Sequence, residues 1–200
     1  MRCKVEFFFK VASIVLLTVL VRLSDNLKIG SKQKFLYTFP KLEILNDNPE
    51  VINFKVNLVQ DSTELHKVSG FVNFSKYADK DLKISFKILK ANKYSLNSAD
   101  FRPTLLALPE SNTHEFMNNL YKPYVMKSVS ACSNLPQFTG KWSAQRSIVG
   151  SYKFNDCALN SKTLPNVFSE GLYCTIMLIK RSEEPKLKAE LRVFMQVTKA

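Results

Sequence analysis

The sequence predicts an all-β fold: a two-sheet immunoglobulin-like β-sandwich with one short helix. Apolar and polar residues alternate along several segments, most clearly at 82–90 and 187–198, and a period of two is typical of a strand with one buried face. Turn residues separate these segments at short intervals, which is typical of sandwiches and barrels. Only one segment has a good helical pattern, which disfavours parallel βαβ units.

The predicted strands follow one another along most of the chain. Proline bends the first of them, and a glycine inside the third indicates a bulge. The last two form a hairpin across a four-residue turn. In order, they are 35–45, the strand with Phe54, Val56 and Leu58 on one face, 65–74 with Gly70, 82–90, and the hairpin strands 172–180 and 187–198.

The middle of the chain is less regular. Residues 91–109 contain several prolines and asparagines and predict a long loop or a bent edge segment. A helix is expected at 111–121, because Asn112 and Glu115 have the spacing of a capping box, and Pro123 is expected to stop it. We further predict a short strand at 124–131 and a loop with the only tryptophan at 135–150.

Length and composition predict one domain behind a signal peptide. The 200 residues are 46% hydrophobic and 23% charged, which is ordinary for a globular protein. Residues 1–24 have the layout of a signal peptide, with basic residues before the apolar run 11–21, which is too short for the roughly 20 residues of a membrane span. Arg22 fits the cleavage site at Ser24 poorly. We expect residues 25–200 to form a single sandwich domain of a secreted, extracellular protein.

Cysteine usage agrees with secretion. Cys3 would leave with the signal peptide, and the odd number that remains predicts one disulfide and one thiol in an oxidising compartment. Cys132 and Cys157 lie in polar contexts, whereas Cys174 lies in an apolar run. We therefore predict a Cys132–Cys157 disulfide and a buried Cys174. The sequon at Asn73 predicts a glycosylation site in a glycoprotein.

Catalytic and metal-binding patterns are missing from the sequence. Its two histidines, His66 and His114, are near no recognisable nucleophile motif, and they have no metal-ligand spacing with each other or with the cysteines. The five glycines form no phosphate-binding loop. We expect no enzyme activity, no catalytic residue, no metal and no cofactor.

The formal net charge of +12 favours anionic partners without naming one. Lysines and arginines are dispersed over many strands rather than clustered, which disfavours nucleic acid as a partner. A solvated, lysine-rich sheet face explains them equally well and also discourages edge pairing.

The abundant aromatic residues leave two alternatives for the space between the sheets. Fifteen Phe and seven Tyr could fill a core, or could line a cavity for an apolar ligand. Periodicity does not distinguish the two, and a cavity of about 300 Å³ or more would favour a ligand. If a ligand binds, the expected lining residues are Phe54, Val56, Leu58, Ile84, Phe86, Ile88, Leu191, Val193 and Met195.

The order of short motifs between 56 and 197 resembles a family of small secreted insect proteins, the CheA/CheB chemosensory group. These motifs are the Val-Ser-Gly-Phe-Val-Asn segment at 68–73, Cys132 after Tyr-Lys-Pro-Tyr, Cys157, Leu164-Pro165, and Glu170-Gly171-Leu172-Tyr173 before the last hairpin. The proposed parent of that family is the ML lipid-recognition superfamily. The chain departs from the family in having Ala158 where a proline usually follows the cysteine.

The resemblance implies an ML-like sandwich over residues 25–200 that binds a lipid or another hydrophobic small molecule between its sheets. It also implies gustatory or pheromone signalling, with a membrane receptor as a possible partner, and it matches Cys132 and Cys157 to the family's disulfide positions. The alternative function is a secreted protein-interaction module with a filled core and a basic surface.

Overall fold

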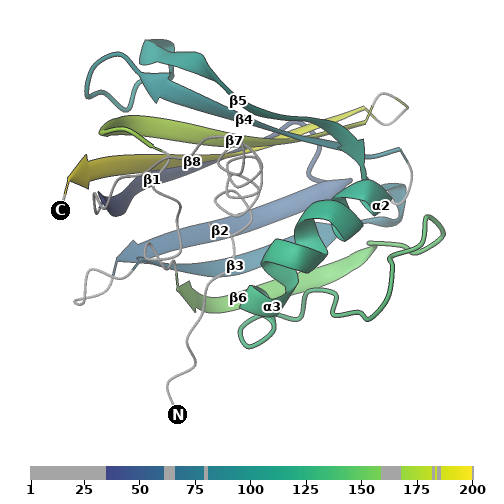
Figure 1. The fold of residues 1–200 in the computed structure, drawn as a ribbon. Coiled ribbons are helices and arrows are strands. Elements are labelled where there is room, and N and C mark those ends of the chain that lie inside the picture. Colours follow the sequence, from purple (N-terminus) through teal and green to yellow (C-terminus); the bar gives the residue numbers. More distant parts are fainter. Residues whose placement is uncertain are drawn as a thin grey trace.

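Alternating strands build two antiparallel sheets that pack face to face (Figure 1). The computed structural model describes residues 35–60, 66–78, 81–158, 168–181, 183 and 186–199; the predicted signal peptide lies outside them. The five-stranded sheet has the order β1 (Phe35–Asn46), β8 (Leu187–Lys199), β7 (Gly171–Arg181), β4 (Lys83–Ala91) and β5 (Phe101–Asn112). The three-stranded sheet has the order β2 (Ile52–Gln60), β3 (His66–Phe74) and β6 (Gly150–Ala158). The predicted all-β sandwich is confirmed.

The period of two places one face of each strand in the core. In β4 the side chains of Ile84, Phe86 and Ile88 are buried, and the intervening ones are more exposed. β7 and β8 form the predicted hairpin, in register from Gly171 opposite Val197 to Arg181 opposite Leu187. Burial of these inner faces is the main stabilising contribution to the sandwich.

The bulge expected in the third predicted strand at Gly70 is instead in β6, where Asn155 and Asp156 both lie opposite Ser69, next to Gly70. The register with β6 shifts between Val68 and Gly70, and Gly70 has φ of 149°. A Cβ atom there would lie 2.0 Å from the carbonyl oxygen of Lys55 on β2. Only glycine fits this close approach of two backbones.

Two predictions for the middle of the chain need correction, and one strand was not predicted. The loop alternative for 91–109 is wrong from Phe101 onward, where β5 forms a bent edge strand with two register shifts against β4. The predicted strand at 124–131 is wrong, because the helix continues there. β6 was missed, since polar Ser151, Lys153 and Asn155 leave only two apolar residues to mark its alternation.

One helical segment follows β5 and runs from the five-stranded sheet toward β6 (Figure 1). It consists of α2 (Thr113–Phe116), the π-helical η3 (Met117–Met126) and α3 (Lys127–Val129). The predicted capping box is confirmed, because Asn112 Oδ1 accepts the Glu115 N–H at 2.9 Å and Glu115 Oε2 accepts the Asn112 N–H at 3.1 Å. Short 3₁₀ turns occur at Lys76–Ala78 and Ser98–Asp100.

Pro123 does not end the helix, contrary to prediction. It lies inside the π-helical stretch, whose wider turns change the backbone hydrogen-bond pattern. Side chains at a spacing of four, Met117, Tyr121, Val125 and Val129, are all buried. Their burial holds the helix on the sandwich beyond the proline, which outweighs the proline's missing N–H.

A second, smaller apolar cluster lies on the opposite side of the five-stranded sheet from the main core. Buried Phe101, Leu172, Cys174 and Phe194 form it, and the rings of Phe101 and Phe194 meet edge to face at 5.5 Å. Cys174 is 3% exposed, as predicted. Burial raises the pKa of its thiol to about 12, so this cysteine is a packing residue.

Candidate ligand pocket

An apolar pocket of about 90 Å³ lies between the sheets, beside the helical segment. Its exposed wall atoms are all apolar. Both sheets, the helical segment and the loop 133–149, here called the cover loop, line it. The sheets contribute Phe54, Val72, Phe74, Tyr152 and Phe154 on one side, and Ile84, Met177 and Ile179 on the other. The helical segment contributes Thr113, Phe116, Met117 and Tyr121, and the cover loop Leu135, Pro136 and Ile148.

Two tyrosines line the pocket with their rings, while their hydroxyls bind the cover loop. The Tyr121 hydroxyl donates to the Pro136 carbonyl at 2.8 Å, and the Tyr152 hydroxyl donates to the Ile148 carbonyl at 3.0 Å. Burial raises the pKa of both hydroxyls above the ordinary value, so they stay protonated. The pocket therefore offers a ligand apolar contact without a hydrogen-bonding group.

Aromatic stacking packs the cover loop against the helical segment. The ring of Phe138 stacks on Tyr121 with centroids 6.3 Å apart, and Trp142 meets Phe138 edge to face at 5.0 Å. Two cations cover the outside of this stack, Lys122 over Phe138 and Arg146 over Trp142. The side of the pocket next to the helix is thus closed by a loop that has no regular structure of its own.

Asn118 joins the helical segment to the cover loop through the backbone of Trp142. Its Nδ2 donates to the Trp142 carbonyl and its Oδ1 accepts the Trp142 N–H, both at 2.8 Å. The same Nδ2 donates to the His114 carbonyl at 3.0 Å. Trp142 is 6% exposed, and its indole Nε1 has no hydrogen-bond partner among the described residues. A buried donor left unpaired costs about 1–3 kcal/mol, so the indole N–H does not help to hold the loop. Asn118, the two tyrosine hydroxyls and ring stacking hold it.

Sequence reasoning identified part of the pocket wall. Phe54 and Ile84 line it. The other seven expected residues face the core between the sheets without lining this pocket; they are Val56, Leu58, Phe86, Ile88, Leu191, Val193 and Met195. The helix and cover-loop residues were missed, because 135–150 was interpreted only as a loop. Apolar residues recur every four positions from Met117 to Val129, and this pattern could have identified the helical wall.

The structure brings Cys132 and Cys157 together. Cys132 follows the helical segment, and its carbonyl accepts the Asn155 N–H of β6 at 2.9 Å. Cys157 lies in β6 rather than in a turn, and a hydrogen bond between the two side chains, together with burial, raises the pKa of its thiol far above the ordinary value. The structure records both as thiols. Their disulfide stays a prediction.

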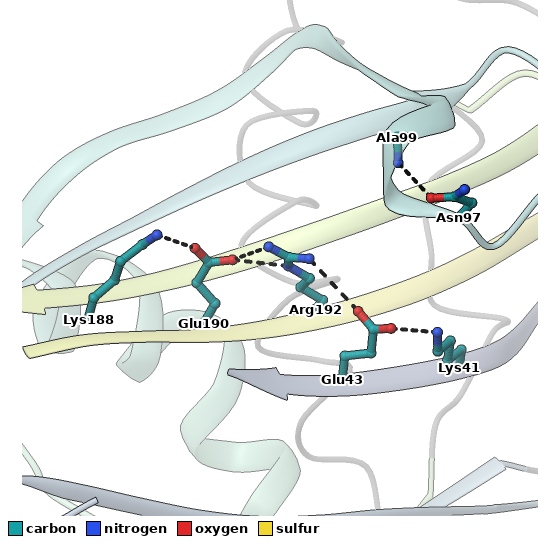
Figure 2. Close-up of polar contacts among 7 residues, drawn as sticks. All are labelled: Lys41, Glu43, Asn97, Ala99, Lys188, Glu190 and Arg192. Atoms are coloured by element: carbon teal, nitrogen blue, oxygen red, sulfur yellow. Dashed lines mark hydrogen bonds and ion pairs between the residues drawn. The ribbon is translucent and has the colours of Figure 1, made fainter. Parts of the chain in front are cut away.

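Charged side chains pair with alternating sign across the outer face of the five-stranded sheet (Figure 2). The Glu190 carboxylate binds the Arg192 guanidinium at 2.7 Å and Lys188 at 3.1 Å, and Glu43 lies between Arg192 and Lys41. Although burial alone would raise it, the hydrogen bonds from Arg192 and Lys188 lower the pKa of the Glu190 carboxyl. These five charges largely neutralise one another.

The structure also places the two histidines and the predicted glycosylation site. His114 is in the first turn of α2, where its Nδ1 lies 3.1 Å from Asn112 Oδ1, and His66 begins β3. Among the described residues, no cluster of His, Cys, Asp or Glu could hold a metal ion. Asn73 lies on the outer face of the three-stranded sheet, with Ser151 donating to its side chain. No helix within the described ranges is long and apolar enough to cross a membrane.

Comparison with known proteins adds no relative. No protein-family model matches this chain, and no curated protein matches it. The resemblance to the CheA/CheB group stays a prediction.

Proposed function

We propose that this protein is a secreted binding protein whose pocket holds the apolar part of a lipid or another hydrophobic small molecule. The observation that carries the proposal is the wholly apolar pocket wall between the sheets, in which both tyrosine hydroxyls are used to hold the cover loop. Apolar walls that enclose a ligand are typical of small-molecule sites. The resemblance described above adds chemosensory signalling and a membrane receptor to the proposal.

The volume restricts the ligand. About 90 Å³ is below the roughly 300 Å³ typical of ligand pockets, and below the engineered cavity of about 150 Å³ that holds benzene. A single alkyl chain or small ring is therefore the part to be bound, and the pocket must widen to accept it. Met117 and Met177 give the walls side chains that adapt readily to a new shape, and the cover loop is the part of the wall that has no strand or helix.

The test offers a fluorescent fatty acid to the delipidated protein. Filling the pocket with Thr113→Phe should abolish probe binding, because Thr113 lines the pocket. Thr38→Phe makes the same change at an exposed position of β1 and should leave binding intact. No binding by the unmodified protein, or equal binding by both variants, would contradict the proposal.

The small volume also favours the alternative function, a protein-interaction module with a filled core. That alternative expects no probe binding, the same stability before and after delipidation, and partners that bind the surface. The fatty-acid titration separates the two functions, because only the first predicts a saturable site that Thr113→Phe removes.

A further inference from the structure

The outer face of the three-stranded sheet, which points away from the pocket, carries polar side chains aligned across its strands. The side chains of one row are amides and a hydroxyl, and those of the next are two lysines on either side of an aromatic ring. The first row is Asn53, Asn73 and Ser151, and the second is Lys55, Phe71 and Lys153. We call these six residues the polar platform.

The platform has positive charge that is not neutralised. Lys55 and Lys153 are exposed, and neither forms an ion pair in the part of the chain that the structure describes. The next row contains the carboxylate of Asp156, whose Oδ1 accepts a hydrogen bond from Ser69 at 2.9 Å. The charged region of Figure 2 on the five-stranded sheet differs, because its lysines and arginine are paired with glutamates. An anionic partner thus gains more on the platform than on that region. Lys83 and Lys87 of β4 are also exposed, but Ser85 rather than an aromatic residue lies between them, so they provide the control pair.

The spacing of the platform suits an extended ligand. Neighbouring strands lie about 4.8 Å apart, so the backbones of Lys55 and Lys153 are about 10 Å apart with Phe71 between them. The Phe71 ring is partly exposed. A ligand that crosses the strands would meet a cation, an apolar surface and a second cation in succession.

The chemistry of the platform selects the ligand class. Asparagine amides and a serine hydroxyl both donate and accept hydrogen bonds, as sugar hydroxyls require. An aromatic ring packs against the apolar C–H face of a sugar, and ammonium groups pair with carboxylates or sulfates. We propose that the polar platform binds an acidic polysaccharide, whose sugars carry carboxylate or sulfate groups.

Other anionic partners fit less well. An acidic protein needs large apolar anchors in a buried centre of the interface, whereas the platform has a single partly exposed ring. An anionic membrane is recognised through apolar side chains that enter it in addition to lysines, and the six platform residues have none that project freely. The proposal goes beyond the pocket, since the platform occupies the opposite face of its sheet.

The predicted glycosylation site belongs to the platform. Asn73 is in its first row, and Ser151 donates to Asn73 Oδ1 at 2.6 Å. A glycan on Asn73 would cover the surface on which the polysaccharide is proposed to lie. The experiment therefore uses the chain produced in a host that adds no N-linked glycan.

The test measures binding of a fluorescent heparin octasaccharide. The double variant Lys55→Ser/Lys153→Ser should bind about tenfold more weakly, because exposed ion pairs each contribute only modestly. Phe71→Thr, which keeps a strand-forming residue, should also weaken binding. Lys83→Ser/Lys87→Ser removes the same charge from exposed positions of β4 and should change binding little. Unchanged far-ultraviolet circular dichroism in each variant shows that the sheets are retained.

Three results would overturn the proposal. Equal losses in the two lysine pairs would show general attraction to a basic protein. Full binding by Phe71→Thr would remove the role of the ring. If polyglutamate bound as tightly as the octasaccharide or more tightly, the partner would be an acidic peptide instead. If vesicles containing phosphatidylserine did so, the partner would be an anionic membrane.

Discussion

Replacing Asn118 with alanine tests whether one amide holds the cover loop closed. The substitution removes two hydrogen bonds to the Trp142 backbone and one to the His114 carbonyl. A hydrogen bond contributes about 1 kcal/mol net, and a buried backbone group left without a partner costs about 1–3 kcal/mol. Alanine gains a few tenths of a kcal/mol in helix propensity. We expect the cover loop to lose about 2–4 kcal/mol of local stability.

The single tryptophan makes this loss directly measurable. Trp142 lies in the cover loop, so its fluorescence reports on the loop, whereas far-ultraviolet circular dichroism reports on the sheets. In urea, the two transitions should coincide for the unmodified protein and should separate for Asn118→Ala, with fluorescence changing first. Acrylamide should also quench the variant more strongly.

The neighbouring residue provides the matched control. Asn119 is exposed on the same helical segment, and its side chain forms no hydrogen bond among the described residues. Asn119→Ala therefore makes the same chemical change without removing a hydrogen bond to the cover loop. Coincident transitions and unchanged quenching in Asn118→Ala would refute the role assigned to this amide.

Three further predictions concern groups that titrate or oxidise. If Cys132 and Cys157 form the predicted disulfide, its reduction should destabilise the fold by about 3 kcal/mol, measured as a lower urea midpoint with dithiothreitol; no shift would contradict the bridge. Cys174 should resist iodoacetamide at pH 8 in the folded protein and react once it is unfolded in urea, because burial raises its thiol pKa to about 12; rapid labelling of the native protein would contradict its burial. Burial raises the pKa of Tyr37 to about 12, and that of Tyr121 also rises, so the stability that these neutral hydroxyls contribute is complete below pH 10 and is lost as the pH rises through their folded pKa values. Ultraviolet titration should show tyrosines that ionise only on alkaline unfolding, and a single transition near pH 10 would contradict this.

The sequence predicted those elements whose local pattern agrees with their place in the fold. β8 and β4 alternate because one face of each packs in the main core along most of its length. β7 was recognised as the apolar partner strand of the hairpin, since its Leu172 and Cys174 are buried on the opposite face as well. The cap at Asn112 was also predicted, since a capping box depends only on residues three apart.

The remaining elements depend on tertiary contacts. Pro123 is a helix breaker in isolation, and only the buried row of the helical segment carries the helix past it. β6 has too few apolar residues to be recognised alone, and it is completed by pairing with β3. Because the helical segment and the cover loop supply seven of the fifteen described residues that line the pocket, the pocket itself was only partly predictable, through Phe54 and Ile84.

The hydrogen bonds between Asn118 and the Trp142 backbone have a consequence for how fast a ligand exchanges. The Asn118 amide, together with the Tyr121 hydroxyl, ties the helical segment to the cover loop, and the loop forms that side of the pocket. Under the proposed function, loosening this part of the wall eases passage in both directions, so Asn118→Ala should raise the association and the dissociation rate of a ligand together.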